Sequence, residues 1–294
     1  MIIKISRTLR TRGISGLLSI AKAHMRSLCG LPAKSFASCK EMFENQRGIE
    51  IGGPSLVFSV RGIFPVYPIV AQLDNCNFSS ATVWEGNIEQ GLTFRYAPNK
   101  APGRQYIAEA IAMRDIPSSS YNFVLSSHAL EHTANPILAL SEWIRLLKDH
   151  GTLALIVPHK DGTFDHKRPV TTIEHLIEDF NAGMPEDDLT HMPEILALHD
   201  LVRDPEAGDL AAFKDRSLHN FENRCFHHHV FDTRLAVNLI DYLGLQIYAV
   251  EAIQPMHILI IAKKMKGGES HNNSAFTCDA AQYRRLSPFS SDHP

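Results

Sequence analysis

Two segments of the chain each join a buried strand to a polar loop. Residues 48–56 read Gly-Ile-Glu-Ile-Gly-Gly-Pro-Ser-Leu, a short apolar strand that ends in an acidic residue and a glycine turn. Residues 121–132 read Tyr-Asn-Phe-Val-Leu-Ser-Ser-His-Ala-Leu-Glu-His, a second apolar strand that runs into a polar loop. Their separation leaves room for two βα units. Both loops are therefore expected at the carboxyl edge of a parallel sheet, where α/β folds bind nucleotides.

Composition excludes several other classes of protein. The chain has 294 residues, of which 44% are hydrophobic and 21% charged, which is ordinary for a globular domain. A net charge of -3 argues against general nucleic-acid binding, which needs an excess of Lys and Arg. The 5 cysteines are scattered and form no Cys-x-x-Cys pair. They support neither a zinc ribbon nor a disulfide framework, and a reducing compartment is expected.

Residues 1–44 form a predicted basic arm. Residues 1–40 contain no Asp or Glu, but they hold eight Lys or Arg residues and several apolar ones. Three interpretations remain open: a helical arm packed on the domain, an amphipathic segment on an anionic membrane surface, or a cleavable targeting segment. The expected location is cytoplasmic, with peripheral membrane or organelle targeting through residues 1–40 as the alternative.

The rest of the chain reads as a sheet interrupted by an insertion. Residues 45–158 hold apolar strands and one helix with a period of 3.6 over 136–148. The stretch 159–230 is rich in histidine and acidic residues, which predicts a mostly helical insertion. Residues 231–264 return to a helix and a strand pair that close the sheet. The polar tail 265–294 is predicted to be disordered.

The segment Ser126-Ser127-His128-Ala129-Leu130-Glu131-His132, with Asn-Pro and Glu-Trp after it, resembles the class I S-adenosylmethionine-dependent methyltransferases. The nearest group is the methyltransferase type 11-like one. The resemblance covers about residues 46–158 and 229–263. It implies a Rossmann-like, seven-stranded, mostly parallel α/β sheet, here with a helical insertion after the fifth strand. It also implies an enzyme that uses S-adenosyl-L-methionine.

The glycine turn is the first cofactor-binding element that the resemblance implies. Glu50, Gly52 and Gly53 stand where the family holds the methionine part of the cofactor. The family's further glycines are replaced here by Pro54 and Leu56. A glycine turn after a strand lets ligand atoms approach the backbone closely.

Further cofactor contacts are expected at the ends of the next strands. Asp74 is the predicted partner of the ribose hydroxyls, with Glu85 as its rival and a plain turn aspartate as the alternative. Glu109 and Ala110 correspond to the pair that lies against the adenine in the resembling family. Ser127 is expected near the reactive sulfonium.

Histidine is the candidate base. Nine of the 16 histidines lie in residues 159–230, a predicted substrate cap. Methyl transfer to oxygen or nitrogen requires the acceptor to lose a proton, which a positioned imidazole can take. His128, His159 and His229 are the predicted catalytic residues. His227 and His229 share one face of an extended chain, but the absence of a His-Glu-x-x-His spacing favours an enzyme without metal.

The sequence thus predicts methyl transfer to an oxygen or nitrogen of a small-molecule or sugar-like acceptor, with no nucleic-acid partner. Two alternatives come from other classes of protein. One is a metal-dependent hydrolase built on the histidine-rich segment. The other is a non-catalytic protein that binds S-adenosylmethionine, which the imperfect glycine loop leaves open.

Overall fold

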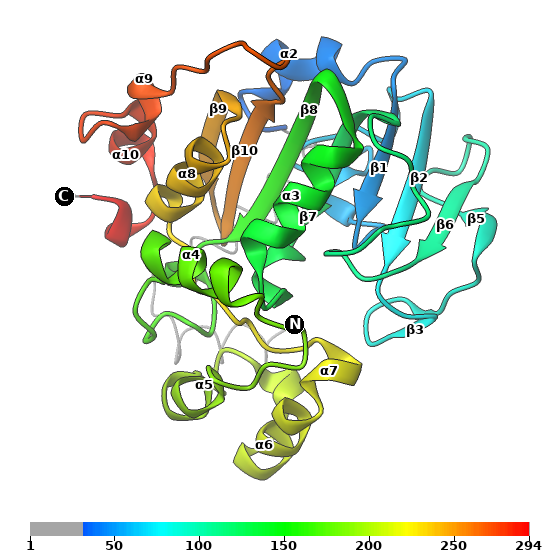
Figure 1. The fold of residues 1–294 in the computed structure, drawn as a ribbon. Helices are drawn as coiled ribbons and strands as arrows, with labels where there is room; N and C mark the ends of the chain where they lie inside the picture. The colour runs from blue at the N-terminus through cyan, green and yellow to red at the C-terminus, as the bar shows by residue number, and fades with distance from the viewer. Residues whose placement is uncertain (1–31, 294) are drawn as a thin grey trace.

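The computed structural model describes residues 32–293, so most of the predicted basic arm lies outside the described residues. A large sheet forms the centre of the molecule (Figure 1), with strand order β5-β6-β2-β1-β7-β8-β10-β9. Its strands are β1 (Arg47–Ile51), β2 (Gln72–Asn77), β5 (Gly91–Phe94), β6 (Gly103–Ile107), β7 (Tyr121–Ser127), β8 (Leu147–Pro158), β9 (Gln246–Ile253) and β10 (His257–Lys263).

The sheet is mostly parallel, as predicted. Strands β6, β2, β1, β7 and β8 run parallel, whereas β10 and β9 close one side antiparallel. The predicted number of strands, seven, is wrong, because β5 adds an eighth, antiparallel strand beside β6. A small hairpin, β3 (Ala81–Thr82) with β4 (Gly86–Asn87), stands beside the sheet.

One face of the sheet is covered by helices. The helices α3 (Pro136–Leu146), α4 (Ile173–Ala182) and α8 (Thr233–Tyr242) share one large apolar cluster with the strands. In α3, the Asn135 side chain accepts a hydrogen bond from the backbone N–H of Leu138 at 3.0 Å, which caps the helix that Pro136 begins. Strand residues that point to this face alternate with those that point to the other.

The opposite face carries short helical turns and loops instead of long helices. They are α2 (Phe36–Cys39), η1 (Lys40–Met42) and η2 (Leu56–Phe58). Pro65 and Pro68 disfavour a regular helix after β1. Aromatic rings fill the space: Phe43 packs edge-on against Phe64 at 5.5 Å and Phe123 at 5.3 Å.

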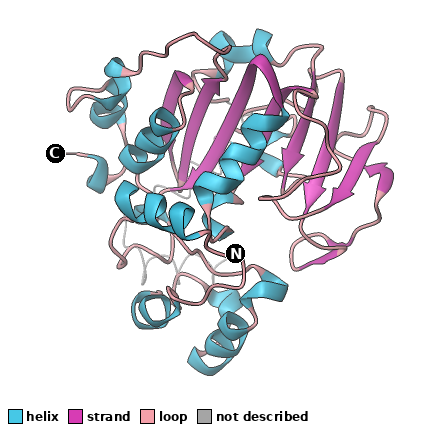
Figure 2. Cartoon of the chain, viewed as in Figure 1, coloured by secondary structure: helices cyan, strands magenta, loops and turns pink. Residues whose placement is uncertain are grey.

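The insertion lies beyond the carboxyl ends of the parallel strands (Figure 1). It is mostly helical, as Figure 2 shows, with α4 followed by α5 (Met192–Leu198), α6 (Leu210–Leu218) and α7 (Asn220–Asn223), and 3-10 turns η4 (Lys160–Gly162) and η5 (Pro205–Ala207). It has its own small core around Phe213 and Phe226. Because α4 packs against α3 and α8 and shares their apolar cluster, the cap proper begins after it.

The C-terminal segment is ordered, which corrects the prediction of a disordered tail. It forms α9 (Ser274–Thr277), α10 (Gln282–Leu286) and the turn η6 (Ser290–Asp292), and Tyr283 joins the main core. The polar composition of the segment gives no sign that a few of its residues, such as Tyr283, are buried. None of the helices formed by residues 32–293 has the length and apolar character needed to span a bilayer.

Candidate functional site

A pocket opens where the carboxyl ends of β1, β2, β6 and β7 meet. This is the position at which parallel α/β sheets bind their ligands. Its lining residues are Ile51, Gly52, Cys76, Asn77, Phe78, Trp84, Ala108, Glu109, Ala110, His128, Ala129, His132, Thr133, Glu186 and Arg224. The predicted residues Gly52, Glu109, Ala110 and His128 are therefore brought together, and the cap adds Glu186 and Arg224.

The turn after β1 depends on glycine. Gly52 has a φ of +80°, and a Cβ atom there would meet the Ala129 side chain at 3.1 Å. A Cβ on Gly53 would lie 2.3 Å from the Glu50 carboxyl group. Asn75 holds the turn from β2, because it accepts from the Gly53 N–H and donates to the Gly53 carbonyl, both at 3.0 Å. The glycine turn, held in place by Asn75, therefore presents backbone atoms without side chains to one side of the pocket.

Glu50 lies behind this loop and not in the pocket lining. Its carboxylate accepts hydrogen bonds from the Ser55 N–H at 3.0 Å and the Tyr67 hydroxyl at 2.6 Å. Full burial raises the pKa of Glu50 to about 7, despite these two donors. Its role in the described structure is to shape the glycine loop.

The position predicted for Asp74, at the end of the second strand, is wrong. Strand β2 continues to Asn77, and Asp74 lies opposite Ile49 in mid-strand. Its buried carboxylate accepts hydrogen bonds from the Arg47 guanidinium and the Tyr121 hydroxyl, both at 2.8 Å. Asp74 does not line the pocket, and neither does its rival, the exposed Glu85. The residue at the strand end is Asn77, which sequence reasoning missed.

Asn77 was missed because the strand boundary was placed three residues too early. Strand β2 carries Gln72, Asp74, Asn75 and Asn77, so it lacks the apolar run that marks a buried strand. The Asn77 side chain donates to the Gly53 carbonyl at 3.1 Å, which ties the two strand ends together.

The cap closes the pocket through one arginine. Arg224 donates to Glu109 at 2.8 Å and forms a second, very close pair with Glu186. Its guanidinium also lies over the Phe78 ring, 5.2 Å from the centroid. Burial raises the pKa of Glu186 to about 7, with Arg224 opposing the shift. No local motif marks Arg224, since its partners come from distant parts of the chain.

His128 stands at the mouth of the β7 loop, directly after the buried Ser127. It has a φ of +53°, and its Nε2 lies 2.8 Å from Nδ1 of His257, which begins β10. Its Nδ1 lies 3.5 Å from the Glu131 carboxylate. Burial, with His128 beside it, lowers the pKa of His257 to about 3, so His257 is neutral near pH 7. His257 was not identified from the sequence.

Glu131 is fully buried, and neither of its oxygens has a hydrogen-bond partner within residues 32–293. Burial alone would raise the pKa of its carboxyl group, but the neighbouring His128 and His132 hold that pKa below the ordinary value. The carboxylate is therefore charged near pH 7, and it is poised to stabilise positive charge on an adjacent imidazole.

A second pair of imidazoles lies deeper under the cap. His132 lines the pocket and meets the His227 ring edge-on at 4.7 Å. Burial and His227 lower the pKa of His132 to about 4. Burial would lower the pKa of His227 as well, but the Asp165 carboxylate, 2.5 Å from Nδ1, raises it.

The structure places two of the predicted catalytic histidines outside the pocket. His159 is fully buried, stacked on Phe289 at 4.0 Å and 3.2 Å from the Asp292 carboxylate. His229 is buried beside the Ala134 carbonyl, 3.3 Å from its Nε2. Neither side chain reaches the pocket, although His159 directly follows the strand β8 that ends at this edge of the sheet.

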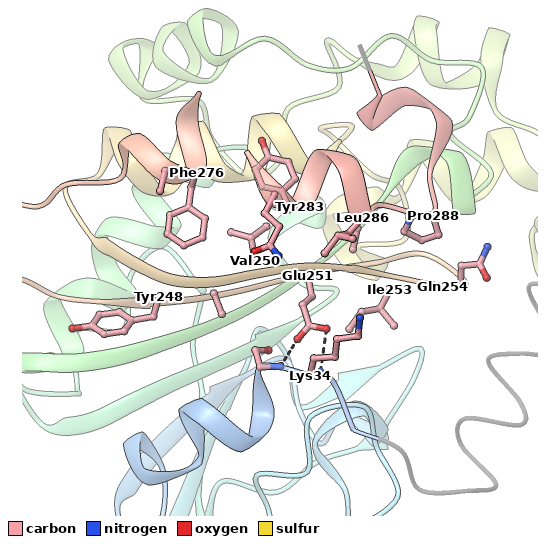
Figure 3. A pocket seen from close by; sticks show the side chains of 15 residues that line it. Lys34, Tyr248, Val250, Glu251, Ile253, Gln254, Phe276, Tyr283, Leu286 and Pro288 are labelled. Atoms are coloured by element: carbon pink, nitrogen blue, oxygen red, sulfur yellow. Dashed lines mark hydrogen bonds between the residues drawn. The ribbon is translucent and has the colours of Figure 1, made fainter. Parts of the chain in front are cut away.

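A larger hollow of about 710 Å³ lies at the edge of the sheet that β9 forms (Figure 3). It is floored by β9 and bounded by α9 and α10, with Tyr248, Phe276 and Leu286 among its lining residues. Glu251 accepts hydrogen bonds there from the backbone N–H groups of Lys34 and Ser35. The hollow contains no residue of the glycine turn or of the β7 loop, so it is not the predicted cofactor site.

Residues 76–155 match the protein family described as "Methyltransferase domain". The solved structures that are similar include methyltransferases from Aquifex aeolicus (11% identity, 79% of this chain and 89% of that chain, TM-score 0.40), Methanosarcina mazei (16%, 76% and 93%, 0.41) and Mesorhizobium loti (12%, 79% and 98%, 0.44). No curated protein matches the chain. The family match confirms the predicted resemblance, and with it an enzyme that uses S-adenosylmethionine.

Proposed function

We propose that this S-adenosylmethionine-dependent methyltransferase methylates an oxygen or nitrogen of a small, sugar-like molecule. The observation that carries the proposal is the composition of the pocket wall. A turn of bare backbone at Gly52 faces a histidine, His128, that is backed by the buried carboxylate of Glu131. The wall thus combines a backbone turn that a ligand can approach closely with a base that a carboxylate supports.

The residues present fit the cofactor. Gly52 has no side chain, so the amino-acid part of the cofactor can approach its backbone. A Cβ atom there would crowd the pocket wall at Ala129. The Asn77 amide, at the end of β2, would bind the ribose hydroxyls in place of the family's acid. Ala108 and Ala110 offer an apolar surface for the adenine, and Glu109 between them offers an acceptor for its amine.

The protein's own part in the reaction is to take a proton. S-adenosylmethionine, when bound, would supply the methyl group, with its sulfur as the leaving group that keeps the electron pair. The acceptor's proton passes to Nε2 of His128, which exchanges its contact with His257 for the acceptor. Glu131 then stabilises the imidazolium.

The lining of the pocket supports a small acceptor. Arg224 and Glu186 from the cap line the pocket together with the strand ends, so the site is a cavity between cap and sheet. Trp84, about half exposed, lies 5.7 Å from the His132 ring and presents a flat apolar face beside the pocket. Such a face suits the C–H surface of a sugar ring. A net charge of -3 gives nucleic acid no general attraction.

The test pairs cofactor binding with turnover. Calorimetric titration with S-adenosylhomocysteine should give micromolar affinity, about -8 kcal/mol. Folded protein that releases no heat at millimolar ligand would exclude the methyltransferase function. A panel of hydroxylated and aminated sugars is then assayed for methylation. His128→Asn should retain affinity within a few-fold and lose about 10²–10⁴ in turnover.

His150→Asn is the matched control, because this exposed histidine lies away from the pocket. Binding without methylation of any acceptor would instead favour the non-catalytic alternative. Equal turnover in His128→Asn and the wild type would assign the proton to another group.

A further inference from the structure

Four side chains converge under the cap, apart from the pocket. His175 and Asp179 lie one turn apart on α4, His191 directly precedes α5, and His229 lies in the segment that leads to α8. One ligand atom from each lies within 4.8 Å of every other. None of the four lines the cofactor pocket. Three segments distant in sequence therefore bring three imidazoles and one carboxylate to a single point.

The spacing of the ligand atoms suits a tetrahedral ion. His175 Nε2 lies 2.8 Å from His191 Nε2 and 3.4 Å from Asp179 Oδ2. Asp179 Oδ2 lies 3.6 Å from His229 Nε2. Four ligands at the usual bond lengths to zinc would lie about 3.3 Å apart in a regular tetrahedron. The other pairs lie within 4.8 Å of each other, so side-chain adjustments of up to about an ångström would bring all four to one Zn²⁺.

The cluster also leaves polar atoms unsatisfied. Asp179 is 3% exposed, yet its Oδ2 accepts no hydrogen bond from residues 32–293. Oδ2 is the atom that faces the imidazoles. His229 is 1% exposed, and its Nε2 has the Ala134 carbonyl as a neighbour at 3.3 Å, a contact that it would give up to bind the ion. Burying such groups without a partner costs free energy, which a bound cation at Oδ2 would offset.

Neighbouring groups hold the four side chains in place. The Thr172 hydroxyl caps α4 by accepting from the His175 N–H at 3.2 Å. The Asn135 side chain donates to the Asp179 carbonyl at 3.1 Å, which fixes α4 against the start of α3. The Asp188 carboxylate lies 3.5 Å from Nδ1 of His191. A carboxylate beside the second nitrogen of a histidine is the usual support of a metal ligand.

We propose that His175, Asp179, His191 and His229 bind one structural Zn²⁺ that fastens the cap to the core. Four protein ligands close the coordination sphere, which is the pattern of structural zinc and leaves no position for a catalytic water. The ion joins α4, which packs against α3 and α8, to the start of α5 and to the loop of residues 227–229. The site therefore supports neither a hydrolase nor a metal role in methyl transfer.

The experiment measures metal content and stability, not activity. The full chain is produced with an affinity tag that lacks histidine, and elemental analysis should find about one zinc per chain. His175→Ala is the principal variant, because 41% of that side chain is exposed and its loss leaves little cavity. Asp179→Asn tests the carboxylate. Both should hold less than about a tenth of a zinc ion per chain while still binding S-adenosylhomocysteine.

His166→Ala is the matched control. This histidine lies in the same insertion, but it pairs with Asp200 at 2.8 Å outside the cluster. It should retain full zinc. Chelation of the wild type should lower its melting temperature by several degrees, with recovery on adding Zn²⁺ but not Mg²⁺, whereas His175→Ala should respond to neither.

Two outcomes would overturn the zinc site. One is a wild-type chain that contains no metal and whose melting temperature does not change with added Zn²⁺. The other is a His175→Ala/His191→Ala double variant that keeps its zinc. Binding of S-adenosylhomocysteine is read separately, so failure of the zinc site leaves the proposed methyltransferase function standing.

Discussion

Asp74 and Asn77 lie on the same short strand but serve different purposes. Asp74 is buried in mid-strand against Arg47 and Tyr121, whereas Asn77 ends the strand at the pocket. Asn77→Ala should remove the partner of the ribose hydroxyls and cost roughly 1–3 kcal/mol of binding, a loss of about 5–150-fold. Titration with S-adenosylhomocysteine measures it.

Asp74→Asn is the companion variant on that strand. Its melting temperature should fall, because Arg47 loses its ion pair, but its cofactor affinity should stay within a few-fold of the wild type. The reverse pattern, with affinity lost in Asp74→Asn and kept in Asn77→Ala, would restore Asp74 as the ribose residue.

Glu50 should make the stability of the protein depend on pH. Its pKa is about 7 when folded, against 4.5 for an ordinary glutamate, because burial disfavours the charged form. Below about pH 4.5 it is protonated in both states. As the pH rises towards 7, the unfolded chain ionises first, so stability is lost, by about 3 kcal/mol for a shift of this size.

The measurement compares Glu50→Gln with the wild type in urea at pH 5 and pH 7.5. The variant should lose less stability than the wild type across this interval, because its side chain cannot ionise. Glu186, whose pKa is also about 7, titrates in both proteins and cancels in the comparison. Parallel losses in the two proteins would show that Glu50 is not the responsible group.

At the scale of elements, the C-terminal segment shows how a few contacts order a polar stretch. Asp292 accepts hydrogen bonds from the Thr233 hydroxyl at 2.6 Å and the Ser287 hydroxyl at 2.5 Å, and it lies beside His159. Asp292→Ala would leave these buried groups unpaired and should cost roughly 2–4 kcal/mol of stability. Thermal unfolding measures it.

Asp279→Ala is the control in the same segment. Its side chain is 83% exposed, so the substitution should have almost no effect on melting temperature. If both variants melt like the wild type, the C-terminal segment contributes no stability through Asp292.

The elements that the sequence predicted well are those marked by local pattern. Strand β7 and the second half of β8 are apolar runs, and α3 carries an N-cap asparagine followed by proline. The sequence pattern predicts too short a strand β2 because polar residues lie inside it, of which Asp74, Asn75 and Asn77 bond to a neighbouring strand or loop. The tail was misread because Asp292 gains its partners only when the fold forms. Burial of polar groups depends on contacts between distant segments, which periodicity does not report.

At the scale of the whole molecule, the pocket too depends on contacts between distant segments that the sequence pattern does not report. The sequence predicted the position of the site at the sheet edge from two loops, one with Gly52 and one with His128, because parallel strands end at one edge. The contributions of the cap did not follow, since Arg224 reaches Glu109 across more than a hundred residues of chain. Nor did the place of His257, which begins β10 beside β8 and reaches His128 with its side chain.

Arg224 joins the cap to the core, and its removal should affect the molecule as a whole. Arg224→Leu deprives Glu109 and Glu186 of their shared cation, and it removes the contact with Phe78. The buried Glu186 and the partly exposed Glu109, left without a counter-ion, would repel each other or take up protons. The cap should open more often, and affinity for S-adenosylhomocysteine should fall by about tenfold or more.

Hydrogen exchange of residues 220–230 provides the second measurement, and it should speed up in Arg224→Leu. Arg216→Leu is the matched control, because Arg216 pairs with Asp204 at 3.0 Å within the cap and away from the pocket. It should change neither affinity nor exchange at the pocket.

The double variant Arg224→Leu/Glu109→Gln should recover part of the lost affinity, because one unpaired carboxylate is gone. Loss of affinity to the same extent in Arg216→Leu would mean that cap stability in general, and not the bridge to Glu109, governs cofactor binding.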